Sequence, residues 1–208
     1  MKTQIISHFI IKVLGYLVLT FALWYYLATW HLAPLVALAH VMMSAWLPDF
    51  IMWVKLQGTT VIVATQYGFD VAGLLVTPPS LEAAGFTLNP LSFGYGLPLF
   101  SALLLATPVS DKGLRLVVGS LILMGLQLLS LLVSILKALT FELDPALQQA
   151  LQWSTWQLDM IALTYQIGFL LLPMIAPLII WALLSQAFLI QLAPQLQGLH
   201  RLPSEQQN

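Results

Sequence analysis

The chain has 208 residues, of which 60% are hydrophobic and only 7% are charged, and its formal net charge is −1. Soluble domains carry about 25% charged residues, so this composition excludes an ordinary soluble domain and a disordered chain. The small net charge excludes a nucleic-acid-binding protein that works through a basic surface, and the absence of cysteine excludes disulfides, thiolate metal sites and a cysteine nucleophile.

We therefore expect an all-α membrane protein, one polytopic domain over residues 1–208 with the lipid bilayer around it. The pattern predicts about four transmembrane helices, a small extracytoplasmic β-hairpin or β element, and interfacial helices. The first span is predicted over residues 13–30, because a crossing needs about 20 apolar residues. It is longer than the core of a signal peptide and ends in interfacial aromatics, so we interpret it as an uncleaved anchor.

Residues 32–46 are also apolar, but they include a proline, a histidine and a serine. At this length we expect an interfacial or re-entrant helix, with a fifth span as the alternative. A fifth span would reverse the sidedness of all that follows.

Residues 50–88 form a predicted β-rich insertion. The runs 50–57 and 59–67 read as strands that meet at Gly58, and residues 71–77 add a third. Because a free sheet edge cannot lie in hydrocarbon, this extracytoplasmic insertion is expected to lie above the membrane or to be covered by protein. There it either meets a partner or substrate or forms a lid over its own helices.

The sequence NPLSFGYGLPL at residues 89–99 leads into the second predicted span, residues 91–109. Asn-Pro is typical of a turn, and paired glycines allow backbones to approach closely. We interpret this block as a site of helix packing or partner contact. Its candidate residues are Asn89, Pro90, Gly94, Tyr95, Gly96 and Pro98.

Two more spans are predicted over residues 114–139 and 160–189, followed by a cytoplasmic tail at 190–208. Residues 145–157 between them favour an amphipathic interfacial helix, which serves as a partner platform or as a plain connector. Lys137 near the outer end of the third span can snorkel, and Asp159 suits the start of the fourth helix; an ion pair between the two is the alternative.

Gln127 and Gln166 lie inside the third and fourth spans. An amide in hydrocarbon needs a hydrogen-bond partner. We therefore expect these two residues to bond across the two helices, with Tyr165 or Ser130 as candidate partners.

The orientation follows from the cations, which gather in the short cytoplasmic connections of membrane proteins. In a four-span arrangement the segments on one side hold Lys2, Lys12, Lys112, Arg115 and Arg201. The opposite segments are mainly acidic. Both termini are therefore expected to be cytoplasmic.

His31, His40 and Asp49 come nearest to a catalytic or metal-binding group. Their spacing matches no zinc signature, and no nucleophile motif is present. We therefore expect no catalytic residue, no cofactor and no metal, and we read these side chains as interfacial polar residues.

Four segments carry a family resemblance: residues 21–28 (FALWYYLA), 89–99, 162–168 (ALTYQIG) and 172–177 (LPMIAP). Together with the length, they resemble the exosortase H-associated membrane proteins of Gram-negative bacteria. The resemblance implies a bacterial inner-membrane protein in an exosortase-type C-terminal protein-sorting system. Exosortases are thought to cleave sorting signals with a cysteine, so no catalytic residue carries over to this cysteine-free chain.

The leading hypothesis is a non-enzymatic accessory protein that binds an exosortase or its sorting substrates at the extracytoplasmic face. One alternative is a membrane-embedded hydrolase or transferase that uses His31, His40 or Asp49. The other is a small transporter or channel subunit, which the scarcity of charges within the spans disfavours.

Overall fold

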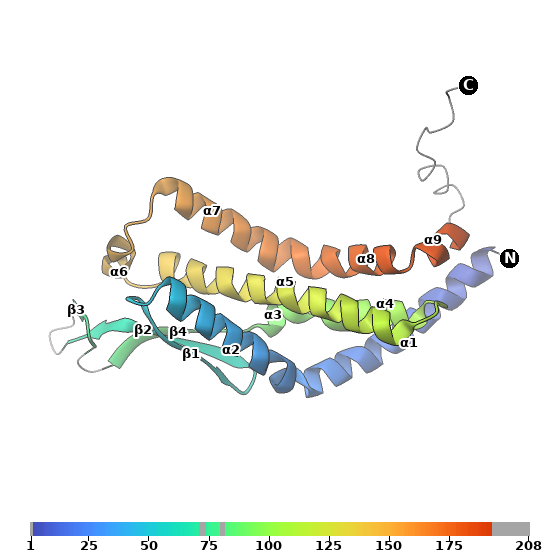
Figure 1. Ribbon diagram of the computed structural model, residues 1–208, viewed down its shortest axis with the longest axis horizontal. Helices are drawn as coiled ribbons and strands as arrows, with labels where there is room; N and C mark the ends of the chain where they lie inside the picture. The colour runs from blue at the N-terminus through green and yellow to red at the C-terminus, as the bar shows by residue number, and fades with distance from the viewer. Residues whose placement is uncertain (1, 71–73, 80–81, 193–208) are drawn as a thin grey trace, which may run out of the picture.

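The computed structural model describes residues 2–70, 74–79 and 82–192 (Figure 1). The helices are α1 (Lys2–Tyr26), α2 (Ala28–Trp46), α3 (Leu91–Gly94), α4 (Gly96–Ala106), α5 (Lys112–Phe141), α6 (Pro145–Ala150), α7 (Thr155–Gln166), the π-helix η1 (Ile167–Leu171), α8 (Leu172–Leu184) and α9 (Gln186–Leu192). The strands are β1 (Ile51–Gln57), β2 (Thr60–Phe69), β3 (Leu75–Val76) and β4 (Glu82–Leu88). The predicted class, a helical membrane protein with a small β element, is confirmed.

Within the described residues, four helical segments are long and apolar enough to cross a membrane: Ile6–Tyr26, Ala28–Trp46, Lys112–Phe141 and Thr155–Leu184. Two differences from the expected spans stand out. The segment expected at the interface, α2, has the length and composition of a span. The segment predicted as a span over 91–109 is shorter, at Leu91–Ala106, and is interrupted between α3 and α4.

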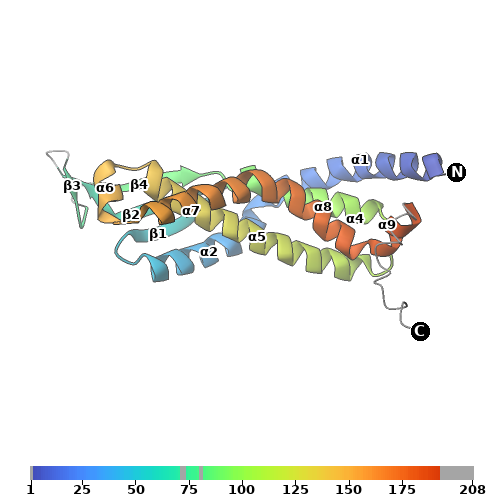
Figure 2. The same ribbon diagram turned by 90° about the horizontal axis from the view of Figure 1, so that it is seen from above.

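The path of the chain shows how α2 relates to α1. Figures 1 and 2 show α2 continuing along the long axis in the same direction as α1, after a break at Leu27. At about 1.5 Å per residue, the 25 residues of α1 and the 19 of α2 measure ~65 Å along their axes. This combined length is roughly twice the hydrocarbon thickness of a bilayer. Because the two helices point the same way, α2 leads away from α1 without turning back.

The chain then returns through α3 and α4, runs forward along α5, and returns through α7, η1 and α8 (Figure 1). The start of α1, the α4–α5 connection and α9 therefore share one end of the molecule, which we call the terminal end. The strands, α6, and the ends of α2 and α5 share the other, which we call the sheet end (Figure 2).

The sheet is antiparallel, with β2 in the centre between β1 and β4, and with β3 pairing at the far end of β2. The predicted hairpin is present, and its turn contains Gly58 at φ +62°. The third strand predicted over 71–77 is observed only as the short β3, since residues 71–73 lie outside the described part. Strand β4 was not predicted.

Helix α2 protects the free edge of β1. The Val54 backbone N–H donates to His40 Nδ1 at 3.3 Å, which satisfies a donor that would otherwise stay open on an edge strand. Behind the sheet, α2 and α5 contribute to a core that includes Met43, Ile135 and Leu139. The sheet is therefore fixed to the helical bundle.

The connector between α5 and α7 differs from the single interfacial helix that was predicted. Helix α6 begins at Pro145, as expected, but ends at Ala150, and Ser154 starts α7 with a capping box. Leu147 is fully buried against the sheet-end core, so α6 packs on protein. The alternative of a Lys137–Asp159 pair is not observed, because Lys137 pairs with Glu142.

Candidate functional site

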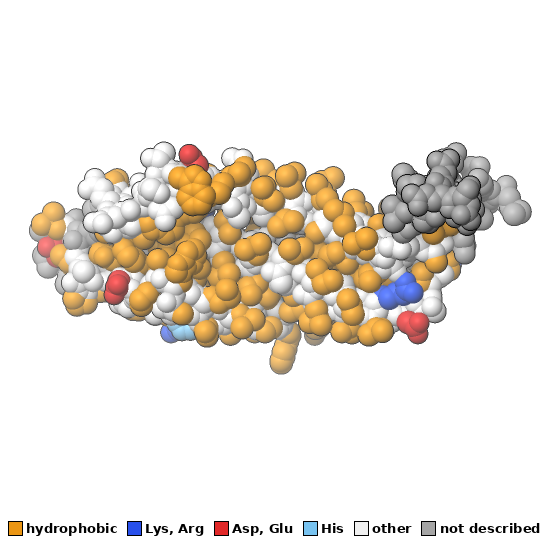
Figure 3. All heavy atoms as spheres, turned by 45° about the horizontal axis from the view of Figure 1, so that its top comes forward, with side chains coloured by type: hydrophobic (Ala, Val, Ile, Leu, Met, Phe, Trp, Pro, Cys, Tyr) orange, Lys and Arg blue, Asp and Glu red, His pale blue; other side chains and the backbone are white. Residues whose placement is uncertain are grey.

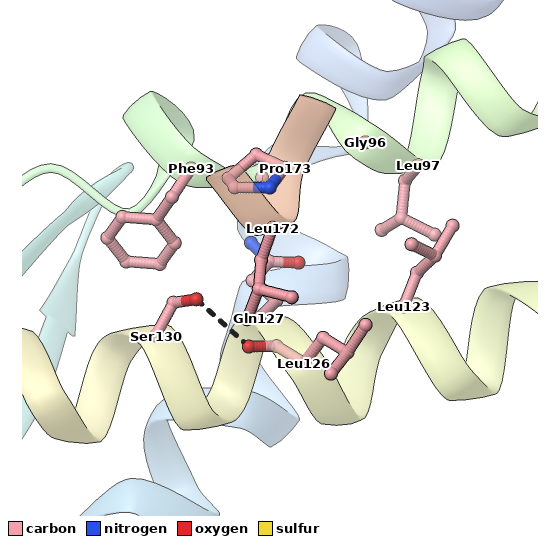
Figure 4. A pocket seen from close by; sticks show the side chains of 10 residues that line it. Phe93, Gly96, Leu97, Leu123, Leu126, Gln127, Ser130, Leu172 and Pro173 are labelled. Carbon is pink, nitrogen blue, oxygen red and sulfur yellow. Dashed lines mark hydrogen bonds between the residues drawn. The ribbon is translucent and has the colours of Figure 1, made fainter. Parts of the chain in front are cut away.

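Gln127 on α5 lies at a junction where two other helices are irregular. The α3–α4 helix is interrupted at Tyr95, and the last membrane helix contains the π-helix η1. Figure 4 shows these elements around a cavity of about 20 Å³. Its lining residues are Phe93, Gly94, Gly96, Leu97, Leu123, Leu126, Gln127, Ser130, Leu172 and Pro173.

The two glycines of the 89–99 block lie at the closest approaches of this junction. A Cβ atom on Gly94 would lie 2.6 Å from Gln127 Nε2 and 3.4 Å from a ring carbon of Trp24. A Cβ atom on Gly96 would lie 2.9 Å from the ring of Pro177. The missing side chains let α3 and α4 pack against α1, α5 and α8 at once.

The remaining candidates of the block are Asn89, Pro90, Tyr95 and Pro98, and hydrogen bonds involve Asn89 and Pro98 near its two ends. The Asn89 side chain accepts from the Leu91 N–H at 3.1 Å, which caps the start of α3. Thr20 on α1 donates to the Pro98 carbonyl at 2.9 Å, which fixes α1 to α4. Pro90 is buried and Tyr95 is half-buried, whereas Asn89 is exposed at the outer end of the block.

The hydrogen bonds predicted for the glutamines are wrong. Gln127 is 4% exposed, and neither its amide nitrogen nor its oxygen has a hydrogen-bond partner within the described chain. Gln166 is exposed and faces away from the junction's interior. Ser130 makes the cross-helix bond instead, donating to the Gly168 carbonyl of η1 at 2.8 Å.

The sequence of the last helix explains this bond. Pro173 has no N–H, so the turn before it cannot complete its α-helical ladder, and the chain widens there into η1. Gly168 lies directly against Ser130, where a Cβ atom would be in ordinary contact with the serine oxygen at 3.4 Å. In the sequence, this irregular turn is indicated by Gly168, which is followed five residues later by Pro173.

The cavity at the junction is small. About 20 Å³ is the space that one water molecule requires, and no ionisable side chain is among the lining residues. The junction therefore fits a role in helix packing and has no room for a substrate.

The histidines and Asp49 do not form a reactive group. His40 Nδ1 is engaged by the Val54 N–H and lies 3.2 Å from the Ser44 hydroxyl. The His31 ring lies 6.0 Å from the Trp24 ring, in an aromatic contact. In the described part of the chain, no three His, Asp or Glu side chains are placed to hold a metal ion.

A second feature lies at the sheet end, between the end of α2 and the start of α7. It is a groove of about 320 Å³ lined by Trp46, Leu47, Trp153, Trp156, Gln157, Met160 and Ile161. We call it the tryptophan groove. Two of its tryptophans are largely open, with Trp46 62% exposed and Trp156 70% exposed. The sequence indicated the tryptophans of the connector but not their meeting with α2.

One protein family, described as exosortase H-associated membrane protein, matches residues 3–188. The chain belongs to this family. The match covers α1 to α8 and includes the junction and the tryptophan groove. No curated protein and no solved structure matches the chain.

Proposed function

We propose that this exosortase H-associated protein is a non-enzymatic accessory protein that binds the exosortase or its sorting substrates at the extracytoplasmic face. The family name supports the association with exosortase H. The observation that carries the proposal is the tryptophan groove, an open apolar surface at the sheet end, opposite to the start of α1 and to α9.

The groove lies beyond the hydrocarbon core of a bilayer that is anchored at the terminal end. Arg115 and Phe141 are 26 positions apart on α5, about 39 Å along the helix, whereas the hydrocarbon core is ~30 Å thick. The groove residues come from the end of α2 and the first part of α7, and the ribbon places these elements at the sheet end, where α5 also ends (Figure 2). An apolar surface outside the hydrocarbon indicates a contact site for another molecule.

The groove also has the composition of a binding site. Tryptophans combine a large apolar surface with an N–H donor, and they are enriched among the residues that dominate protein interfaces. Hydrophobic side chains cover much of the face seen in Figure 3. Exposed apolar residues continue from the groove along both flanking helices: Leu38, Val41 and Met42 on α2, Met160 and Leu163 on α7, and Ile167 at the start of η1.

The distribution of charge supports an orientation for this surface. Lys12, Lys112 and Arg115 lie at the terminal end, whereas Asp49 and Glu142 lie at the sheet end. Because cations favour the cytoplasmic side, we place both termini in the cytoplasm and the sheet outside, in a bacterial inner membrane.

Neither alternative gains a supporting observation. The junction cavity is too small for a substrate. The ring nitrogen of His40 that faces the sheet is used by a backbone donor, so a hydrolase built on His31, His40 and Asp49 lacks an assembled group.

Co-purification tests the proposal. We expect exosortase H, co-expressed in the same membrane, to be retained by the tagged protein in mild detergent, and Trp156→Ala to reduce the retained amount. Trp30→Ala is the matched control, since Trp30 is 81% exposed but lies near the α1–α2 break. Failure to retain either exosortase or a sorting substrate would contradict the proposed function.

A further inference from the structure

A second open hollow lies at the terminal end, where α1 meets the α4–α5 connection and α9. Its volume is about 330 Å³, and it is lined by Gln4, His8, Phe9, Lys12, Ala106, Pro108 and Phe188. We call it the terminal hollow. The proposed function makes no use of it.

Aromatic contacts hold its walls together. The Phe9 ring stacks on Trp181 of α8 at 5.8 Å and lies 5.2 Å from the Phe188 ring of α9. These contacts attach α1 to the last helices and leave the space beside Ala106 and Pro108 open. One part of the hollow is therefore apolar, and the part towards Lys12 is polar.

Lys12 gives the polar part of the hollow a positive charge, and Lys112 and Arg115 lie at the same end of the molecule without lining the hollow. Lys12 is exposed and has no ion pair within the described chain. Lys112 donates to the Leu105 carbonyl and Arg115 to the Leu184 carbonyl, which are neutral acceptors that leave both charges uncompensated. Among the described residues of this end, Asp111 is the one carboxylate set against these three cations.

We propose that the terminal hollow binds an anionic phospholipid. Lys12 pairs with the lipid phosphate, Gln4 and His8 offer hydrogen-bond donors beside it, and an acyl chain follows the apolar wall of Phe9 and Phe188. Basic pockets between membrane helices are suited to anionic headgroups. A free phosphate ion would leave the apolar wall unused, so the structure favours the lipid.

The depth of Lys12 agrees with this assignment. Lys12 lines the hollow together with Ala106, the last residue of α4, and Pro108, which follows it. Beyond Lys12, α1 continues to Tyr26 without another charge. A lysine at the point where an uncharged apolar segment begins lies at headgroup depth.

Lipid binding to the full-length protein in mild detergent tests the proposal. The titrated probes are phosphatidylglycerol and phosphatidylcholine with identical acyl chains, and bound lipid is counted by native mass spectrometry. We expect a preference for phosphatidylglycerol. Lys12→Ala should weaken its binding roughly fivefold, the equivalent of the ~1 kcal/mol that one lysine contributes at an anionic surface.

Two further variants make the result specific. Lys12→Arg keeps the charge and should retain binding. Lys55→Ala removes an exposed lysine on β1 at the sheet end and should bind as the unmodified protein does. The proposal is overturned if Lys12→Ala binds normally, if both lipids bind equally, or if inorganic phosphate at the lipid concentration displaces phosphatidylglycerol. The co-purification experiment is independent of these outcomes.

Discussion

Gly96 is the first residue of α4 and faces the proline-rich α8, at one of the closest contacts between the two helices. A Cβ atom there would lie 2.9 Å from the Pro177 ring and 3.2 Å from the Pro173 carbonyl oxygen. Neither a proline ring nor a backbone carbonyl yields easily, so Gly96→Ala should destabilise the fold by about 1–3 kcal/mol. A lower midpoint of thermal unfolding in detergent is the measurement.

Gly125 provides the matched control, because nothing lies within 4 Å of the Cβ that alanine would add there. It lies inside α5, where alanine is favoured over glycine by up to ~1 kcal/mol. Gly125→Ala should therefore unfold at the same temperature or a higher one. Equal midpoints for the two variants would contradict the packing role of Gly96.

The amide of Gln127 is expected to cost stability, because both of its polar atoms are buried without a partner in the described chain. Gln127→Met has a similar shape without these polar atoms. We expect its unfolding midpoint to equal or exceed that of the unmodified protein. A clear fall would show that the amide makes a stabilising hydrogen bond.

At the scale of elements, the contact between α5 and η1 depends on Ser130. Its hydroxyl reaches the Gly168 carbonyl across the helices, so Ser130→Ala should cost ~1 kcal/mol. Ser134 is equally buried, but its hydroxyl bonds only to the Ser130 carbonyl of its own helix, at 2.7 Å. Ser134→Ala should therefore cost less. The reverse order of unfolding midpoints would show that η1 is not held by this bond.

Some elements could be predicted from local sequence and others could not. The limits of α5 followed from its long apolar run between Arg115 and Lys137, and the β1–β2 hairpin followed from β-branched residues around Gly58. Strand β4 was not predicted from the sequence, because its alanines and glycine are weak strand formers and its pairing with β2 is non-local. Pro34 counted against a span over 32–46, but α2 continues through it.

The site was predictable to a smaller extent. Glycine and proline in the 89–99 block indicated close packing, because such residues have little use in a plain span. The sequence could not show which helices would meet there. It also assigned the cross-helix bond to the glutamines, because the proline that widens the last helix at η1 does not show which α5 side chain the Gly168 carbonyl will face.

At the scale of the whole molecule, the proposed orientation can be measured directly because the chain contains no cysteine. Single cysteines at Gln149 on α6 and Gly113 at the start of α5 would lie at opposite ends, and both positions are exposed. We expect a membrane-impermeant thiol reagent, added to intact spheroplasts, to label Gln149→Cys and spare Gly113→Cys. The opposite pattern would place the sheet in the cytoplasm.

The central claim is that the sheet end meets the exosortase or its substrates. A photo-crosslinking amino acid at position 156, in the tryptophan groove, tests it in the intact membrane, with position 121 on the exposed face of α5 as the control. We predict an adduct with exosortase H or a sorting substrate from position 156 and none from 121. An adduct from 121 alone, or from neither position, would contradict the account.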